Sequence, residues 1–521
     1  MVQVGSDDVA AVELEAALAG APSLNRLLEI VVQVHADRTA VVDSSTGDVF
    51  TYAQFGERVR AAAQALQGLG IRPGDRVAIV LPNSWQYAVT YFAVQAVGAV
   101  AVLVNIRFTV GEIEHVLGDS GSALVVTDAE LRSRIPGDAR TALADEVTAA
   151  SAASGEWAAA EREPQDPANL LYTSGTTGKP KGAIQTHANL VFNAAANRRL
   201  YATTPDDRML IAAPFFHATG LNSQLIGALS AGAGVVIQPS FKKAETLQLL
   251  ADHRITFFAG VATMLQLLIL DPTFGDRDLS GLRIFVLGGS PVQESVLDLA
   301  DEHLPQTVLG NVWGLTEATS IVTSVAGQEF REHPRSVGRP IDQVEVAVWD
   351  EGSGAFATEP DEVGELCVRG PLVTAGYWEN AEATAQTYQD GWLHTGDVGR
   401  IDADGYVYVL DRTKDMIIRG GENVYSLEIE NALSAHPDVA LVAAFPRPDE
   451  IFGERVCVAI VATPGSSPSE SDLKLWAARR LADYKVPVEW TFLDEMPLTA
   501  SGKIIKRRLA DAVPGSDSVV G

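Results

Sequence analysis

Two hydrophobic periods alternate along most of the chain, one typical of helices and one typical of buried strands. From Thr51 a helix-like stretch leads through a Pro-Gly turn into a short apolar run, and the same order then returns. The first segments are Tyr52–Leu69 (helix), Arg76–Leu81 (strand), Trp85–Val97 (helix) and Val100–Val104 (strand). Strands joined by helices predict parallel sheets with helices on their faces, which is an α/β fold.

The alternation continues through the middle of the chain. Further strands are predicted at Ala123–Val126, Met209–Ala213, Val235–Gln238, Ile255–Phe258 and Ile284–Leu287, and further helices at Ala244–His253 and Thr263–Leu270. The Ala-rich, acidic stretch 139–163 is interpreted as a helical or loose connection.

The pattern becomes more β-like after about residue 340, with strands predicted at Val344–Trp349, Gly364–Arg369 and Tyr406–Leu410. Residues 411–433 then combine charged positions, a Gly-Gly turn and a helix that begins around Ser426. This change predicts a domain boundary. The remaining strands (Val439–Phe445, Val456–Thr463) and helix (Glu470–Leu481) are enough for a small α+β domain.

One apolar run, residues 88–104, approaches the length of a membrane span. Gly98 divides it into a helix-like half and a β-branched half, which favours a buried helix followed by a buried strand. The N-terminal stretch is acidic and has no basic segment before an apolar one, so we expect neither a secretory signal nor a transit peptide.

Composition narrows the class of protein. The chain has 521 residues, 47% of them hydrophobic, which is enough for two or more domains with large cores. Its net charge of −28 opposes non-specific attraction to nucleic acid or anionic membranes, and we expect neither as a partner. Cys367 and Cys457 lie far apart in strand-like runs, which predicts structural thiols in the cytoplasm.

A loop rich in glycine and hydroxyl side chains, LYTSGTTGKPKG at residues 171–182, predicts a phosphate site. Its glycines let the backbone approach an anion, its hydroxyls and N–H groups can bond phosphate oxygens, and its lysines add positive charge. A Walker-type loop is excluded because Lys179 is followed by Pro180 rather than by Ser or Thr. The candidate phosphate-binding residues are Thr173, Ser174, Gly175, Thr176, Thr177, Gly178, Lys179 and Lys181.

This loop resembles the signature of the adenylate-forming (ANL) superfamily, which includes acyl-CoA synthetases, luciferases and peptide-synthetase adenylation domains. A second stretch, GNVWGLTE at residues 310–317, is similar to the family's aromatic-Gly-x-Thr-Glu element. The resemblance implies that Trp313 packs on adenine, Thr316 bonds the α-phosphate, and Glu317 holds Mg²⁺ together with Thr173. Most relatives carry tyrosine where this chain has Trp313, and a purely structural tryptophan is the alternative.

Two further motifs complete the resemblance. In WLHTGD, residues 392–397, it implies that Asp397 accepts both ribose hydroxyls and that Arg412 supports ribose and phosphate. In PLTASGKIIKRRL, residues 497–509, it implies that Lys503 bridges the substrate carboxylate and the α-phosphate. One ammonium between two anions lowers their repulsion. Taken alone, Lys503 would be read as part of a solvated basic tail.

The remaining assignments also depend on the resemblance. Lys414 occupies the domain hinge, and Gly420 and Gly421 border the path of the CoA thiol. His217, in PFFHATG, lies between the carboxylate site and the acyl pocket, although a core histidine is the rival interpretation. Gly288 is counted among the cofactor-binding residues. The other histidines, His187 and His394 among them, lack metal-ligand spacing, so no zinc site is predicted.

The resemblance implies a two-domain architecture. Residues 1–410 form a large domain of parallel and mixed sheets between helices with a small β-barrel-like part, residues 411–415 form the hinge, and residues 416–521 form a mobile α+β domain. Fatty-acid or 4-coumarate CoA ligases are the implied relatives, acting on ATP with Mg²⁺, a carboxylic acid and coenzyme A. A monomer or homodimer is expected.

Three alternatives stay open on sequence grounds. A luciferase-like oxygenase would share the adenylation residues. An amino-acid adenylation enzyme that loads a carrier protein would need an Asp near His217, and PFFHATGLNSQ has none. A nucleotide-binding regulatory protein would need neither Lys503 nor Glu317. We therefore expect an AMP-forming acyl-CoA ligase for an apolar acid, with a pocket drawn from residues 217–221, 258–261 and 288–291 and from Gly310.

Overall fold

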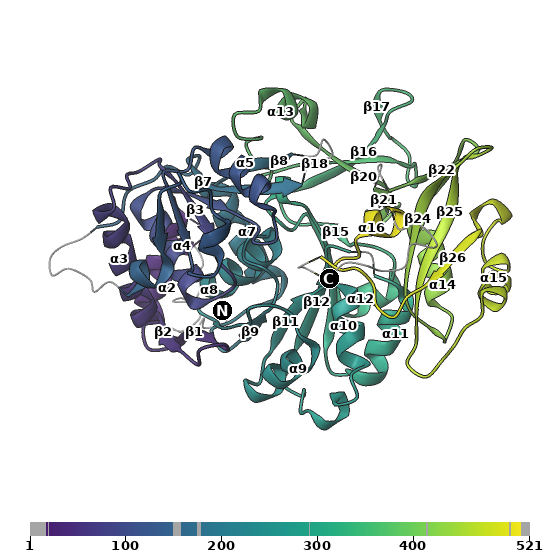
Figure 1. Ribbon diagram of the computed structural model, residues 1–521, viewed down its shortest axis with the longest axis horizontal. Coiled ribbons are helices and arrows are strands. Elements are labelled where there is room, and N and C mark those ends of the chain that lie inside the picture. The colour runs from purple at the N-terminus through teal and green to yellow at the C-terminus, as the bar shows by residue number, and fades with distance from the viewer. Residues whose placement is uncertain are drawn as a thin grey trace, which may run out of the picture.

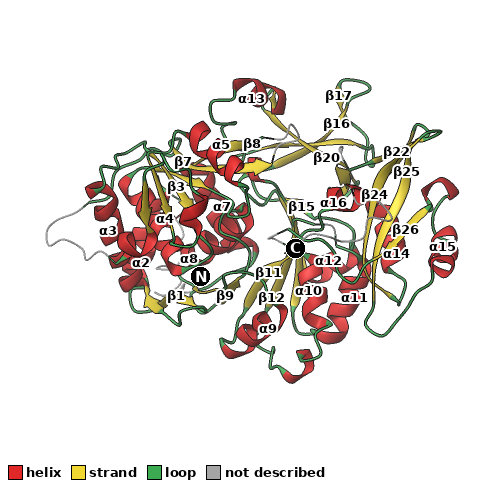
Figure 2. Cartoon of the chain, viewed as in Figure 1, coloured by secondary structure: helices red, strands yellow, loops and turns green. Residues whose placement is uncertain are grey.

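The computed structural model describes residues 17–18, 20–149, 158–174, 179–290, 292–412, 415–499 and 502–511. Within these residues the strands form four sheets, and helices cover the nine-stranded sheet and the sheet that contains β3–β8 (Figures 1 and 2). The N-terminal elements lie at one end of the molecule and β22–β26 with α15 at the other (Figure 1).

The largest sheet of the described residues has nine strands in the order β15-β14-β13-β12-β11-β9-β10-β1-β2, and its middle strands, from β13 to β1, run parallel. The parallel α/β prediction is confirmed. The strand bounds are β1 Thr39–Asp43, β2 Val49–Thr51, β9 Arg208–Ile211, β10 Gly234–Ile237, β11 Phe257–Gly260, β12 Ile284–Gly288, β13 Val308–Trp313, β14 Thr323–Ala326 and β15 Arg339–Pro340.

The second sheet has the order β6-β5-β3-β4-β7-β8 and is parallel except for the β7–β8 hairpin. Its strands are β3 Arg76–Val80, β4 Val100–Leu103, β5 Leu124–Thr127, β6 Thr141–Leu143, β7 Pro167–Ser174 and β8 Pro180–Thr186. The helices of this half are α2 Leu24–Val34, α3 Tyr52–Gly68, α4 Trp85–Val97, α5 Val110–Ser120, α6 Ala144–Thr148, α7 His187–Leu200 and α8 Gly227–Ser230, with a π-helix, η2, at Thr219–Ile226.

Opposite faces of the nine-stranded sheet belong to different cores. Phe257 on β11 joins the core shared with α2–α4 and α7, whereas the next residue, Phe258, joins the core beneath α9–α12. Side chains alternate between the faces of a strand, so one residue decides which core a position enters. The covering helices are α9 Lys243–Asp252, α10 Ala262–Ile269, α11 Glu294–His303 and α12 Gly327–Glu332.

Local signals explain the helix ends. Thr51 and Gln54 form a capping box that starts α3 at Tyr52, as predicted. Helix α4 ends at Gly98, whose φ of +78° suits glycine, and β4 follows at once. Residues 88–104 are therefore a buried helix and strand, and none of the described helices has the length and apolarity needed to cross a membrane.

The third sheet corresponds to the predicted β-rich region. It has the order β17-β16-β18-β20-β19, with β21 pairing β20. Its elements are β16 Glu345–Asp350, β17 Ala355–Phe356, β18 Gly364–Arg369, α13 Ala381–Thr387, β19 Tyr388–Gln389, β20 Trp392–Ile401 and β21 Val407–Arg412. This sheet corresponds to the small barrel-like part that we expected.

The fourth sheet begins after Arg412 and has its own hydrophobic cores, which include Ile417, Val458 and Leu473. Its elements are β22 Ile417–Arg419, β23 Glu422–Val424, α14 Ser426–Ser434, β24 Val439–Asp449, β25 Gly453–Ala462, α15 Glu470–Ala478, β26 Glu489–Phe492 and α16 Lys506–Asp511. The predicted α+β composition and the helix start at Ser426 are confirmed. Since β21 is the last strand of the third sheet, the change of sheet falls between Arg412 and Ile417.

Candidate active site

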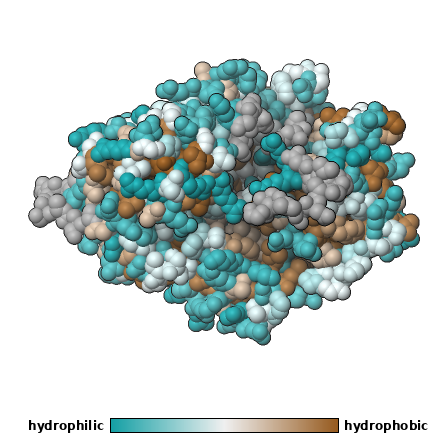
Figure 3. Space-filling view, in the orientation of Figure 1, coloured by the Kyte–Doolittle hydropathy of each residue, from teal (hydrophilic) through white to brown (hydrophobic). Residues whose placement is uncertain are grey.

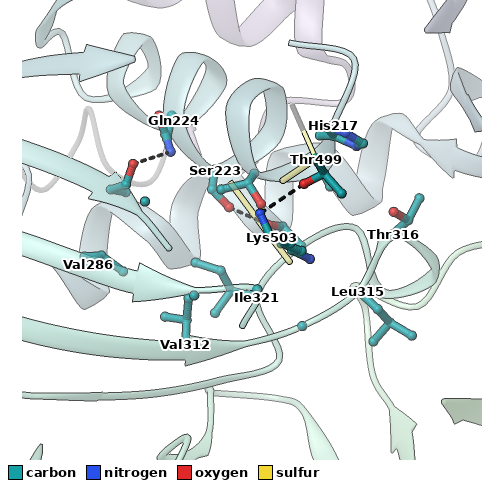
Figure 4. A pocket seen from close by; sticks show the side chains of 18 of the residues that line it. His217, Ser223, Gln224, Val286, Val312, Leu315, Thr316, Ile321, Thr499 and Lys503 are labelled. Atoms are coloured by element: carbon teal, nitrogen blue, oxygen red, sulfur yellow. Dashed lines mark hydrogen bonds between the residues drawn. The ribbon is translucent and has the colours of Figure 1, made fainter. Parts of the chain in front are cut away.

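A cavity of ≈ 460 Å³ opens where β11, β12 and β13 end at their carboxyl termini. In open α/β sheets ligands bind outside this edge. His217, Thr316 and Lys503 line the cavity, which brings three of the predicted site residues together from distant parts of the chain (Figure 4). Gly288 lines it as well.

Lys503 reaches the cavity from a tight loop near the C-terminus. The Thr499 hydroxyl accepts the Lys503 N–H at 3.0 Å, and the Thr499 N–H donates to the Lys503 carbonyl at 2.7 Å. The amine lies against Gly289, where an added Cβ would come within 3.1 Å of Nζ. Glycine at this position, with φ of +75°, leaves the space that the lysine occupies.

The surroundings of Lys503 favour its neutral form. Loss of hydration, followed by the Arg412 guanidinium, lowers the pKa of Lys503 to about 8, and Asp397 opposes part of this shift. Burial and then Lys503 lower the pKa of His217 to about 4. At pH 7 the cavity therefore holds an ammonium on Lys503 beside a neutral imidazole, which can accept or donate a hydrogen bond without adding charge.

The pKa of Lys503 predicts a pH profile. Its ammonium form is present below about pH 8 and is lost as the pH rises through that value, so kcat/KM for ATP should fall on the alkaline side, since kcat/KM reports groups of the free enzyme. Initial rates of pyrophosphate release across this range measure it. A profile that stays level, or the same decline in Lys503→Ala, would contradict the assignment.

Asp397 is the centre of a second group beside the cavity. Its Oδ2 accepts the indole N–H of Trp313 at 2.7 Å, and its Oδ1 lies 3.0 Å from Nε of Arg412. Asp397 is only 4% exposed and Trp313 only 7%. The structure thus joins the predicted adenine, ribose and phosphate residues in one hydrogen-bonded set. Trp313 therefore has a role that a phenylalanine could not fill, because only the indole can donate a hydrogen bond to Asp397.

Removing that donor gives a prediction. Trp313→Phe leaves a buried carboxylate oxygen of Asp397 without its partner, which costs about 1–3 kcal/mol, so we expect the KM for ATP to rise by roughly 5- to 50-fold with a smaller change in kcat. Steady-state kinetics at saturating acid measure the effect. Trp85→Phe, at another buried tryptophan outside the cavity, is the control and should leave the KM unchanged. An unaltered KM in Trp313→Phe would show that the bond does not position Asp397.

The turn before Asp397 is held by a residue that the sequence analysis missed. Glu365 accepts the Gly396 N–H at 2.8 Å and lies 2.7 Å from Nδ1 of His394, whose ring also contacts the Cys367 thiol at 3.5 Å. Contrary to the spacing argument for His394, these three side chains lie within 4.8 Å of one another. Burial and then Glu365 raise the pKa of Cys367 to about 12, so the thiol is neutral and the set serves as support for the turn.

Glu317 has a hydrogen-bond partner that lies outside the GNVWGLTE motif. Tyr377, sixty residues later, donates its hydroxyl to Oε1 of Glu317 at 2.8 Å. The ammonium of Lys181 lies 5.4 Å from the centre of the Tyr377 ring, so this lysine and the carboxylate flank one tyrosine. No other hydrogen bond is formed by Glu317 side-chain oxygens within the described part of the chain, which leaves Oε2 for a ligand. A hard carboxylate oxygen suits Mg²⁺.

The predicted phosphate loop lies at the tip of the β7–β8 hairpin. Thr173 pairs with Lys181, and β8 begins at Pro180, in agreement with an extended turn after Lys179. Ser174 ends β7. Four positions of the loop, Gly175, Thr176, Thr177 and Gly178, fall outside the described residues, as does the predicted hinge residue Lys414.

Gly420 and Gly421, which were assigned to the path of the CoA thiol, lie outside the cavity. They form the exposed turn between β22 and β23, with φ of +62° and +89°, and do not line the cavity that holds Lys503. The Gly420 N–H donates to the Phe452 carbonyl, which ties this turn to the one between β24 and β25. Ile418, Ile451 and Phe452 are exposed there, and Figure 3 shows hydrophobic surface at that corner of the molecule.

The prediction of which residues line the acyl pocket was only partly right. Phe215, Leu221 and Phe258 are fully buried in the two cores rather than in the cavity wall, and Gly310 does not line it. The apolar wall comes instead from Phe257, Ala259, Val286, Val312 and Ile321. The error has a simple cause, since a strand sends adjacent side chains to opposite faces and the sequence did not show which face bears the site.

Comparisons with known proteins agree with this arrangement. The family model for AMP-binding enzymes matches residues 28–378, and the model for the AMP-binding enzyme C-terminal domain matches residues 428–503. Feruloyl-CoA synthase of Amycolatopsis sp is 38% identical, covering 88% of this chain and 93% of its own. A long-chain-fatty-acid–CoA ligase of Mycobacterium tuberculosis is 34% identical, covering 91% and 95%.

A solved structure shares the fold over nearly the whole length. The o-succinylbenzoate CoA synthetase of Bacillus subtilis, in complex with its acyl-adenylate intermediate, superposes with a TM-score of 0.83 at 32% identity and covers 94% of this chain and 98% of its own. The chain therefore belongs to the AMP-binding enzyme family, among the acyl-CoA synthetases of the adenylate-forming superfamily.

Proposed function

We propose that this chain activates an apolar monocarboxylic acid, fatty or aryl, in the cavity that contains Lys503. The enzyme is an AMP-forming acid–thiol ligase: ATP and a carboxylate give an acyl-adenylate and pyrophosphate, and CoA then displaces AMP to form the thioester. The observation that supports the proposed site is the meeting of Lys503, Thr316 and His217 in one cavity, with Asp397 and Arg412 beside it.

The proposed roles follow from charge and geometry. Asp397 accepts the ribose hydroxyls, and the hairpin residues Thr173 and Lys181 receive the outer phosphates. The ammonium of Lys503 lies between the attacking carboxylate and the α-phosphate, where it offsets their mutual repulsion, and Thr316 bonds the α-phosphate. Glu317, with Thr173, would hold Mg²⁺, which neutralises phosphate charge and assists departure of pyrophosphate.

The cavity wall supports an apolar acid. Phe257, Val286, Val312 and Ile321 supply apolar surface, and no Asp or Glu occurs among the described residues that line the cavity. The α-ammonium of an amino acid would be left without a counter-charge there, at a cost of several kcal/mol. This argues against a carrier-loading amino-acid enzyme.

We also propose that residues 416–521 move as a domain about the hinge at 411–415. Lys503 occupies the cavity while Gly420 and Gly421, assigned to the thiol path, face solvent with an exposed apolar cluster. Both cannot serve the same site in one orientation, so a rotation would bring the glycine turn to the acyl-adenylate for the second half-reaction. We place the enzyme in the cytoplasm as a monomer or homodimer.

The test is a carboxylate panel. Pyrophosphate release should require an acid and should be highest with aryl or fatty acids, and thioester should form only when CoA is added. Amino acids that drive release better than these acids would overturn the proposed substrate class. Pyrophosphate release without thioester formation would point to a different acceptor.

A further inference from the structure

Three side chains of different chemistry converge beside the turn that carries Asp397. Cys367 on β18 pairs directly with His394 on β20, and Glu365 lies two residues before Cys367, so strand alternation places it on the same face of β18. The three side chains offer one oxygen, one sulfur and one nitrogen atom, all within 4.8 Å of one another. Strand pairing, rather than spacing along the sequence, brings them together.

The distances between these atoms are close to those of a zinc site. Zinc bonds thiolate sulfur at about 2.3 Å and nitrogen or oxygen at about 2.0–2.2 Å in a tetrahedron, so neighbouring ligand atoms are about 3.3–3.6 Å apart. Cys367 Sγ lies 3.5 Å from His394 Nδ1, within this range. Glu365 Oε2 lies 2.7 Å from the same nitrogen, so only this pair would have to separate. Water would take the fourth position.

Burial and charge also favour a divalent ion at this place. Cys367 is fully buried, whereas the side chains of His394 and Glu365 are 13% and 27% exposed, which leaves an entry from solvent on their side. Zn²⁺ with one thiolate, one carboxylate and one neutral imidazole has no net charge, so burial of the complex costs little. Trp349 packs edge-on against the imidazole, with 5.8 Å between ring centroids, and thereby orients it.

The ligand set separates this ion from the Mg²⁺ of the reaction. Magnesium prefers six oxygen ligands and keeps several waters, whereas thiolate and imidazole select zinc and similar transition metals. Coordination replaces the thiol proton: the S–H bond of Cys367 breaks, its electron pair forms the bond to zinc, and the proton passes to solvent.

The same side chains support the position of Asp397. Strand β20 is bulged opposite Glu365 and Cys367, and the bulge contains Gly396 and Asp397. Glu365 accepts the Gly396 N–H through Oε1, while its Oε2 meets His394. Zinc at Oε2 would draw charge from this acceptor and move it away from His394. Gly396 would shift with it, and so would the neighbouring Asp397 carboxylate.

We propose that Glu365, Cys367 and His394 form a zinc site whose occupation weakens nucleotide binding. The effect on the nucleotide rests on the proposed role of Asp397, whereas metal binding does not depend on that role. Coupling between two sites is reciprocal, so a bound nucleotide must weaken zinc binding by the same factor.

Metal binding is tested with Co²⁺, whose bond to a thiolate absorbs in the near ultraviolet. The full-length enzyme, treated with a chelator and desalted, should bind one Co²⁺ per chain with this band, and Zn²⁺ should displace it while Mg²⁺ should not. Cys367→Ala should lose the band. His394→Asn should weaken Zn²⁺ binding at least about 100-fold, measured by competition with a chromogenic chelator.

Cys457 provides the matched control. It is also buried, and its Sγ lies 3.7 Å from Glu489, but Arg447 and Arg455 pair with that carboxylate and oppose a further cation. Cys457→Ala should therefore keep the Co²⁺ band. A wild type without the band, a band that survives in Cys367→Ala, or one that is lost in Cys457→Ala would overturn the zinc site.

Nucleotide binding is measured with AMP, whose single phosphate holds Zn²⁺ far less tightly than the triphosphate of ATP does. Zn²⁺ should raise the Kd of AMP at least about 5-fold in the wild type and leave it unchanged in Cys367→Ala, and AMP should weaken Zn²⁺ binding equally. An AMP affinity that Zn²⁺ does not change, or changes as much in Cys367→Ala, would overturn the coupling to the nucleotide.

Discussion

Lys503→Ala should form acyl-adenylate at least about 100-fold more slowly than the wild type, while converting a supplied acyl-adenylate to thioester at nearly the wild-type rate. The lysine lies in the cavity beside Gly289, and its ammonium is the cation placed to offset two approaching anions. The second half-reaction forms no new bond to phosphorus, so it does not need that charge. Single-turnover assays of each half-reaction separate the two effects.

A control for this variant lies in the same C-terminal unit. Lys474 is exposed on α15, and Lys474→Ala removes an equal side chain at a distance from the cavity. It should leave both half-reactions unchanged. Equal losses in both steps for Lys503→Ala would reduce this lysine to a general structural or binding role and remove the support for two domain orientations.

Glu317→Gln should lower the rate of adenylation by roughly 100-fold at limiting Mg²⁺, with partial recovery as Mg²⁺ is raised. The amide still offers an oxygen to the Tyr377 hydroxyl, which bonds Glu317 at 2.8 Å, so the loop keeps its shape and only the charge is lost. Initial rates of pyrophosphate release against Mg²⁺ concentration measure the change.

Tyr377→Phe tests the position of the Glu317 carboxylate without changing its charge. It removes the hydrogen bond to Glu317 but keeps the carboxylate, so the expected loss is smaller, about 10-fold or less, with little change in the Mg²⁺ requirement. A Mg²⁺ dependence that is the same in Glu317→Gln and wild type would exclude Glu317 from the metal site.

Local signals in the sequence predicted much of the fold. The capping residue Thr51 and the terminator Gly98 act within a few residues of their helices, so the bounds of α3 and α4 were predicted closely. The change of pattern after residue 410 likewise preceded a new sheet with its own core. These features depend on neighbours along the chain, which a sequence displays directly.

Contacts between residues that lie far apart along the chain could not be predicted from the sequence. The Trp313–Asp397 bond joins positions 84 apart, and the Glu365–Gly396 bond joins positions 31 apart across two strands. The faces of β11 were also assigned wrongly, because Phe257 and Phe258 are chemically alike and only the tertiary structure shows which one meets the cavity. Motif residues could be named from sequence, but the groups that position them could not.

The central claim is that the enzyme activates its acid as an acyl-adenylate, and the fate of the acid's oxygen tests it most directly. The enzyme is incubated with ATP, Mg²⁺, CoA and an aryl acid labelled with ¹⁸O in its carboxylate, and AMP and inorganic phosphates are analysed by mass spectrometry. Attack of the carboxylate on the α-phosphorus, followed by displacement by CoA, leaves one carboxylate oxygen on AMP. The account predicts AMP that carries one ¹⁸O atom per turnover and unlabelled pyrophosphate. Label in inorganic phosphate, or thioester formed together with unlabelled AMP, would contradict it.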